Sequence, residues 1–473
     1  MSVRNLDLPT AGTSTAEPWI WRELAATMRL AMPIALTQLG QVAMMTTDLA
    51  LVGRLGEEAM AAAALGHTIL FALFVLGMGL VAAVAPLAAQ AFGARDPRMV
   101  RRSLRVGLWA AFLLGLPITV ILLQGESILL WLGQKPETAA LAARYLSGLA
   151  WSVVPGWWFI AVRNFMSAVN RPEPALWIMF GAVPINGLLA YALINGAFGL
   201  PHLDLLGAGI ATTSVNIVMC VAAFWIASAM RPFRKYQVLG HFWRPDWPLF
   251  RKLLVIGLPI SGSFALEYGL FAFAAIMMGW ISIAALAAHQ IALQIAAIMF
   301  MVPLGIGIAA TVRVGQFVGQ RDVQAMRRAG FVAIVVGALF MAAMTVAVAL
   351  TRDYIPLLFL GTDIAPDNAT MLLAAKLLLL GASFFIADGV QTIAAGALRG
   401  LNDTRIPLIF AAISFWAIGF VSAYVFAFWA GLGAEGVWIG LSVGLAVFSA
   451  LLISRFHRLT KRGYMPELSK PAG

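Results

Sequence analysis

The chain is dominated by apolar runs of about 20 residues that recur along its whole length. One such run, wound as a helix, crosses the hydrocarbon core of a bilayer, which is about 30 Å thick. Only 11% of the residues are charged, against about 25% in soluble proteins. The alternating segments of about 10 residues that a transmembrane β-barrel needs are not seen. The sequence therefore predicts an all-α integral membrane protein, because lipid offers no partner for unpaired backbone groups.

Twelve membrane spans are predicted from these runs. We expect them at 26–52, 61–87, 105–124, 142–163, 174–198, 206–229, 252–280, 285–311, 329–350, 371–398, 406–430 and 434–455. The span at 174–198 is the least regular, since Pro184, Asn186 and Asn195 lie inside it.

The net charge of +11 resides in the loops, where Lys and Arg alternate between rich and poor connections. The rich segments follow the second, sixth, eighth and twelfth spans. The positive-inside rule places these segments, and with them both termini, in the cytoplasm. The first 18 residues are polar and lack the apolar core of a signal peptide. We therefore expect a multi-pass membrane protein with no nucleic-acid partner.

An internal repeat relates the two halves of the chain. FGARDPRMVRR at 92–102 aligns with VGQRDVQAMRR at 318–328, and MPIALTQLGQ at 32–41 aligns with LPISGSFALE at 258–267, both at an offset of 226 residues. Parallel six-helix repeats are typical of transporters, with substrate sites near the repeat interface. The predicted organisation is a tail at 1–25, an N-lobe at 26–229, a basic linker at 230–251, a C-lobe at 252–457 and a tail at 458–473. A central cleft should lie between the lobes.

Three acidic residues fall within spans: Asp48, Glu267 and Asp388. A charge at the bilayer centre costs at least about 2.5–3.5 kcal/mol, so each needs a reason. A structural salt bridge would need an intramembrane Lys or Arg, and we expect none at mid-span. The remaining explanation is the handling of cations or protons.

A carboxylate in an apolar interior can exchange a proton or Na⁺ for a cationic substrate, because any of these relieves its charge. Glu267 and Asp388 belong to the same half and are expected to share one site for Na⁺ or H⁺. Asp48 belongs to the other half and would form a separate site. A cleft with acids and no basic residues suits organic cations and would repel phosphates.

Further side chains near the acids are candidates for substrate binding. The polar candidates are Gln41, Asn186 and Gln290, and the aromatic candidates are Phe264, Tyr268, Phe384 and Phe385. Polar residues at helix centres, including Thr212, His289 and Gln391, more often form hydrogen bonds between helices. Aromatic residues could form a cation-tolerant wall, although ordinary packing explains each of them as well.

Motifs for catalysis are missing from the sequence. It has no Walker A, GxSxG or HExxH pattern, which argues against ATP-driven transport and hydrolase activity. The single cysteine, Cys220, cannot form an internal disulfide. We expect no enzymatic activity, no cofactor and a monomer in contact with membrane lipid.

Three stretches resemble the MATE family of multidrug and toxic compound extrusion transporters, most closely the bacterial NorM type. They are MPIALTQLGQVAMMTTDLALVGRLG at 32–56, AAHQIALQIAAIMFMVPLGIGIAATVRVGQFVGQRD at 287–322 and ADGVQTIAAGALRGLNDTR at 387–405. The resemblance, which covers nearly the whole chain, implies twelve helices in two six-helix lobes, as in the MOP superfamily. It also implies antiport, with a drug leaving as Na⁺ or H⁺ enters.

The resemblance assigns roles residue by residue. Glu267 matches a seventh-helix glutamate and Asp388 a tenth-helix aspartate, which together belong to the C-lobe cation site of the family. Asp48 matches the first-helix aspartate of the N-lobe site, and Gln41 and Asn186 match polar positions near it. Some relatives carry an aspartate one turn after Asn186, where this chain has Ala190, so coupling through the C-lobe is favoured.

The predicted function is therefore efflux of cationic, amphipathic drugs across the bacterial inner membrane in exchange for Na⁺ or H⁺, with alternating access between the lobes. A flippase for lipid-linked precursors is an alternative within the same superfamily, but its anionic substrate calls for a basic cleft. Coupling to H⁺ alone is a second alternative. A non-transporting scaffold or receptor is a third, and it would not need three intramembrane acids.

Overall fold

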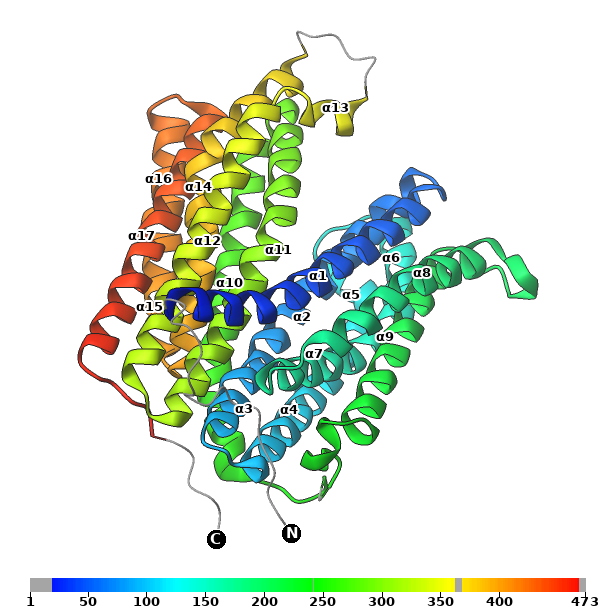
Figure 1. Cartoon of the computed structure of the whole chain (residues 1–473). Coiled ribbons are helices and arrows are strands. Elements are labelled where there is room, and N and C mark those ends of the chain that lie inside the picture. The colour runs from blue at the N-terminus through cyan, green and yellow to red at the C-terminus, as the bar shows by residue number, and fades with distance from the viewer. Residues whose placement is uncertain (1–18, 241, 362–367, 468–473) are drawn as a thin grey trace.

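The computed structural model describes residues 19–240, 242–361 and 368–467, and all regular elements within them are helices. Twelve long helical segments run through the molecule (Figure 1). They are α1 (Trp19–Gly53), α2 with α3 (Glu57–Ala82, Val84–Gly93), α4 (Pro97–Leu123), α6 with η1 and α7 (Pro136–Leu149, Ala150–Ser152, Val153–Ala168), α8 (Glu173–Asn195), α9 (Asp204–Ala229), α10 (Trp247–Ile281), α11 (Ile283–Gln320), α12 (Val323–Thr351), α14 (Ala369–Gly400), α15 to η5 (Arg405–Ala411, Ala412–Phe420, Val421–Tyr424, Val425–Trp429) and α17 (Gly433–Lys461). Short helices α5 (Gly125–Trp131), η2 (Ala197–Gly199), η3 (Phe233–Tyr236) and α13 (Ile355–Leu360) lie in connections.

Within the described residues, eleven of these segments are both long and apolar enough to cross a membrane. The twelfth, α1, is 35 residues long but is interrupted by polar side chains such as Gln38, Gln41 and Asp48. The predicted architecture of twelve membrane helices is confirmed. The least apolar membrane helix, α1, is thus the one that carries the predicted site residue Asp48.

Several predicted boundaries are wrong because the helices continue past the apolar runs. α1 begins at Trp19, inside the predicted tail at 1–25, and α10 begins at Trp247, inside the predicted linker at 230–251. α17 continues to Lys461, past the predicted lobe limit of 457. Polar residues in the first or last turn of a helix lengthen it but do not raise the hydropathy of the segment, so a prediction from hydropathy leaves them out. Side-chain caps mark such starts, as where Asp246 accepts a hydrogen bond from the Leu249 backbone N–H.

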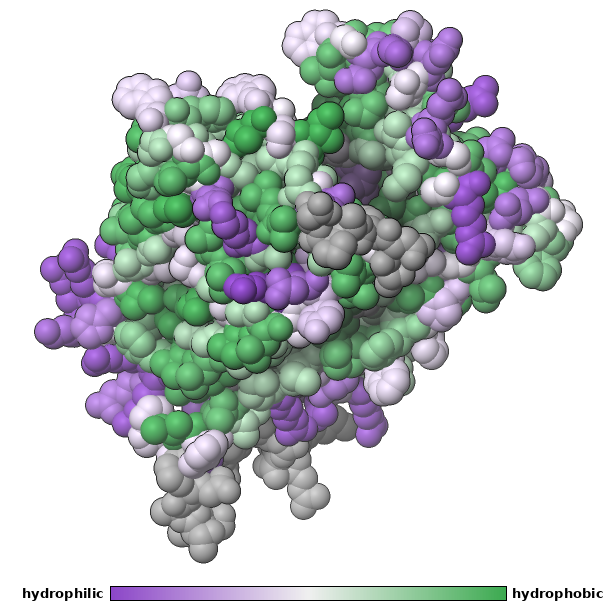
Figure 2. Space-filling view, turned by 90° about the horizontal axis from the view of Figure 1, so that it is seen from above, coloured by the Kyte–Doolittle hydropathy of each residue, from purple (hydrophilic) through white to green (hydrophobic). Residues whose placement is uncertain are grey.

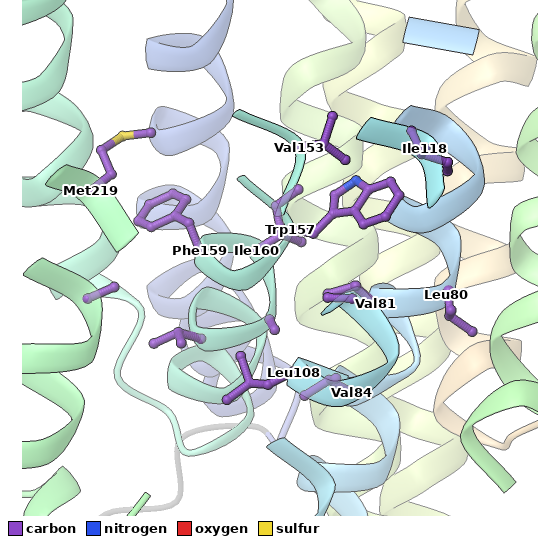
Figure 3. Close-up of a cluster of buried hydrophobic side chains, with 14 of the residues drawn as sticks. Leu80, Val81, Val84, Leu108, Ile118, Val153, Trp157, Phe159, Ile160 and Met219 are labelled. Carbon is purple, nitrogen blue, oxygen red and sulfur yellow. The ribbon is translucent and has the colours of Figure 1, made fainter. Parts of the chain in front are cut away.

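The molecule consists of two lobes, each with its own core of buried apolar side chains. The N-lobe core centres on the indole of Trp157, which is fully buried among Val81, Ile118 and Val153 (Figure 3). In the C-lobe core, Trp438 is the largest buried side chain. We call the surface at linker residues 230–246 the linker face, and the opposite surface, at α13, the α13 face (Figure 1).

The lobes exchange the first part of their first helix. Leu30 and Ala31 of α1 pack in the C-lobe core, whereas Leu253 and Ile256 of α10 pack in the N-lobe core. This corrects the predicted lobes at 26–229 and 252–457, since the start of each sequence half belongs to the core of the other lobe. Hydropathy predicts which segments cross the membrane, but it does not predict which lobe each segment packs against.

Near the linker face, the lobes pack backbone against backbone. A methyl group on Gly93 of α3 would overlap the backbone carbonyl of Gln316 on α11, and one on Gly319 would overlap that of Gln90. Gln90 and Gln316, like Gly93 and Gly319, are 226 residues apart, so the two contacts are equivalent under the sequence repeat. The contact between α3 and α11 is therefore a symmetric junction.

The same two glutamines form hydrogen bonds across this junction. Gln90 Nε2 donates to the Gly400 carbonyl (2.9 Å), and Asn402 Nδ2 donates to Gln90 Oε1 (2.9 Å). In the other direction, Gln316 Nε2 donates to the Ala168 carbonyl (3.0 Å) and to Asn170 Oδ1 (2.9 Å). We call these four bonds the amide latch.

Toward the α13 face, the lobes diverge (Figure 1). The space-filling view of that face shows a recess with polar surface in its depth, bordered by apolar surface (Figure 2). The lobes are thus closed near the linker face and open at the α13 face.

Candidate functional site

The C-lobe acids come from two helices that meet through one glutamine. α10 carries Glu267, and α14 carries Asp388 and Gln391. Gln391 Nε2 donates to Glu267 Oε1 (2.8 Å) and to Asp388 Oδ1 (3.1 Å). Asp388 is buried and Glu267 is half-buried. The structure therefore brings together the two acids that the sequence predicts to share a site.

This arrangement leaves the carboxylate pair in need of positive charge. Since one nitrogen contacts both acceptors, the two oxygens lie within about 6 Å of each other, and two ionised carboxylates at that distance repel by about 3 kcal/mol at an effective dielectric constant of about 20. One amide group cannot offset that repulsion with a full charge. A bound proton or monovalent cation would relieve it.

A small, partly open cavity of the C-lobe begins at Glu267 and Gln391, and the empty space of about 380 Å³ around it includes open solvent. Its lining comprises Ile260, Ser263, Phe264, Glu267, Gln391, Ala395, Arg399, Asp403, Thr404, Pro407, Phe415 and Phe448. Gln391, Ala395, Arg399 and Asp403 follow one another at four-residue steps, so they line one side of the cavity. At the end near the linker face, Asp403 forms an ion pair with Arg455 (2.8 Å).

Asp48 forms a separate site in the N-lobe. Asn186 Nδ2 donates to its Oδ1, and Thr212 Oγ1 donates to its Oδ2 at 3.0 Å. Asp48 and Asn186 are both buried. Each oxygen of this carboxylate thus has a donor of its own, unlike those of the C-lobe pair.

Two of the predicted aromatic residues lie close to the acids. Phe264 lines the cavity, and the Arg399 guanidinium lies over its ring at 4.8 Å from the centroid. Tyr268 is half-buried next to Glu267 in the chain, and its ring packs on Phe71 of α2 with centroids 5.5 Å apart. Tyr268 therefore contacts the opposite lobe.

Other predicted binding residues are placed differently. Phe384 and Phe385 are each only 1% exposed and pack against Trp438, so the expectation that they line a substrate wall is wrong. They belong to the apolar core of the C-lobe and do not line its cavity. Gln290 is exposed on α11, and Gln41 is half-buried on α1, two turns before Asp48.

Two basic residues lie near the ends of membrane helices rather than at their centres. Arg163 is buried in α7, five residues before that helix ends, and donates to Gln38 of α1. Arg399 lies in the last turn of α14, one residue before the helix ends, and lines the cavity.

The sequence did not single out the residues that organise the acids. Gln391 and Thr212 were expected only to join helices, and both in fact contact an intramembrane carboxylate. The spacing of Gln391, one turn after Asp388, was the available signal. Within the described residues, no three His, Cys, Asp or Glu side chains cluster as a metal site.

Comparison with known families places the chain among transporters. The model of the MatE family matches residues 33–192 and 259–425. A probable multidrug resistance protein NorM of Rhodopseudomonas palustris is 60% identical over 463 residues, which covers 98% of this chain and 97% of that protein. A protein of the same description from Bradyrhizobium diazoefficiens is 58% identical, covering 93% and 94%.

Solved structures share the fold at lower identity. The outward-facing structure of a multidrug resistance MATE family transporter of the MOP superfamily superposes with a TM-score of 0.85 at 21% identity, covering 96% of this chain and 99% of that one. A MOP superfamily transporter from Pyrococcus furiosus, described as having a binding pocket of reverse polarity, gives 0.83 at 20% identity, covering 96% and 99%.

Proposed function

Because the chain belongs to the MatE family, we propose that it is a multidrug efflux transporter that exports cationic, amphipathic drugs in exchange for Na⁺ or H⁺. The chain is a multi-pass membrane protein and not an enzyme. The observation that supports the exchange most directly is the C-lobe pair, in which Glu267 and Asp388 share the single donor Gln391.

The route proposed for the exchange uses the two faces of the molecule. If the basic linker lies in the cytoplasm, the recess at the α13 face opens to the outside of the cell. A cation from outside would load the C-lobe pair and favour release of the drug. Rocking of the lobes would then expose the site to the cytoplasm, as expected for parallel repeats.

The direct test is efflux of ethidium from cells of a strain that lacks its own exporters. Glu267→Gln and Asp388→Asn should each abolish cation-driven efflux, because each removes one charge from the pair. Glu57→Gln is the matched control, since this carboxylate is exposed at the start of α2. Efflux at the wild-type rate by both site variants would refute the coupling role.

The coupling ion can be identified with purified protein in liposomes. We favour Na⁺, since the two carboxylates that share Gln391 offer it oxygen ligands, and coupling to H⁺ alone is the alternative. Drug flux would be measured with a Na⁺ gradient and an H⁺ gradient imposed separately. Flux that responds to the H⁺ gradient only would select the alternative.

The flippase alternative requires a site for an anionic head group. Two arginines lie near the ends of membrane helices, but Arg163 is bonded to Gln38, and Arg399 faces the pair of Glu267 and Asp388. Since Asp403 is paired with Arg455, these three groups set the charge of the site, which is negative and favours a cation as substrate. Transport of a lipid-linked precursor, without drug flux, would support the flippase instead.

A further inference from the structure

One side chain in the C-lobe cavity carries a permanent positive charge that the exchange described above does not use. Arg399 lines the same cavity as Glu267 and Gln391. It lies eight residues after Gln391 on α14, which is about 12 Å along the helix axis. A guanidinium keeps its charge at neutral pH. The cavity therefore connects a fixed cation to Glu267, which Gln391 links to Asp388.

The other charges that line the cavity are already compensated. Asp403, the second acid in the lining, forms its ion pair with Arg455 at 2.8 Å. Within the described residues, Arg399 forms no ion pair of 4.0 Å or less, and its guanidinium lies against the Phe264 ring. The acid whose field it feels is Glu267. Arg399 thus balances the carboxylate pair across the cavity rather than by direct contact.

The three charges have a simple sum. With both carboxylates ionised, Glu267, Asp388 and Arg399 together carry one negative charge. An uncompensated charge inside the membrane is costly, so the lobes should rearrange most readily when the site is neutral. One monovalent cation, or one monovalent cationic drug, provides that neutrality.

We propose that Arg399 is a built-in counter-ion that fixes the charge of the C-lobe site at minus one, so that one monovalent cation is exchanged for each drug cation. The proposal rests on the proposed function of the same site. It makes Arg399 a residue that determines stoichiometry through its charge, without contact to the transported ion.

A charge rescue tests this assignment. Glu267→Gln leaves a site of zero charge, which has no need of a cation, and should lose cation-driven ethidium flux in liposomes. Adding Arg399→Gln to that variant returns the site to minus one, and the double variant should recover flux. Arg399→Lys preserves the charge and should keep wild-type stoichiometry. Size-exclusion profiles of all variants report whether they fold.

The single variant Arg399→Gln gives the second readout. Its site carries two negative charges, so the drug-free protein should take up two monovalent cations at saturation instead of one, as measured by equilibrium binding of radiolabelled Na⁺ and by proton uptake. An unchanged number of bound cations, or a double variant with no more flux than Glu267→Gln, would overturn the role of Arg399. If wild-type protein shows no cation-driven drug flux at all, the proposed function itself fails.

Discussion

The buried carboxylates of this chain differ in the hydrogen-bond donors and positive charges around them. These differences distinguish the acids of the proposed exchange site from acids with a structural role. Asp48 has one donor for each oxygen, so its hydrogen bonds are satisfied without a cation. Glu267 and Asp388 share one amide donor and remain the least satisfied acids of the interior. Asp246, outside the membrane spans, is paired with Arg102 at 2.6 Å. The exchangeable site is therefore expected at the C-lobe pair rather than at Asp48.

Asp246 allows a prediction about pH at the level of one residue. Burial acts to raise its pKa, but the hydrogen bond and charge of Arg102, the Leu249 backbone N–H and the charge of Arg105 together outweigh that effect and hold the pKa below its ordinary value. A carboxyl whose pKa is lowered on folding contributes stability above its unfolded pKa of about 3.9, and loses it as the pH falls through the folded value. Asp246→Asn should therefore lower the melting temperature in detergent at pH 7, by a difference that shrinks below about pH 3.9.

The control for this variant is Asp322→Asn. Asp322 caps α12 by accepting from the Ala325 N–H at 2.9 Å, as Asp246 caps α10, and asparagine caps a helix about equally well. The control should change the melting temperature by less than Asp246→Asn does at pH 7. Equal losses in both variants would mean that the ion pair with Arg102 adds nothing.

At the level of elements, the junction of α3 and α11 determines how closely the lobes approach. Gly93 and Gly319 each face a backbone carbonyl of the opposite helix, where no side chain fits. Because the facing atoms are backbone, neither helix can yield by changing a rotamer. Glycine at these two positions is therefore required by the contact between lobes and not by a turn.

Gly319→Ala tests the element packing. The added methyl group should separate α11 from α3 and lower stability by about 1–3 kcal/mol, the usual cost of overpacking a tight contact. Gly181→Ala on α8 is the control, because nothing lies within 4 Å of a methyl group there. Thermal unfolding in detergent measures both, and a Gly319→Ala protein as stable as the control would contradict the packing argument.

For the whole molecule, the pseudo-twofold repeat provides each lobe with one half of the amide latch. Gln90 reaches the end of α14 in the C-lobe, and Gln316 reaches the end of α7 in the N-lobe. All four bonds lie near the linker face, where the lobes are in contact. They hold the arrangement that is open at the α13 face, and they must break before the opposite arrangement forms.

Gln90→Ala combined with Gln316→Ala should shift the molecule toward opening at the linker face. Four hydrogen bonds at about 0.5–1.5 kcal/mol each amount to several kcal/mol, which is enough to change which state predominates. Distances between spin labels on Arg95 and Arg321, in a Cys220→Ala background, would report the change. Both labelled positions lie at helix ends near the junction. An unchanged distance distribution would show that the latch does not bias the equilibrium.

The sequence alone determined the class of fold, the twelve spans, the repeat and the three intramembrane acids, because bilayer thickness and the cost of buried charge act on local composition. Only the tertiary structure decided how these parts meet. In the structure, Gln391 lies between Glu267 and Asp388, and Arg399 lines the cavity. Phe384 and Phe385 pack in the core of the C-lobe. The first parts of α1 and α10 each pack in the core of the opposite lobe. These outcomes depend on which face of each helix packs on which neighbour, and hydropathy in an almost uniformly apolar helix does not distinguish its faces.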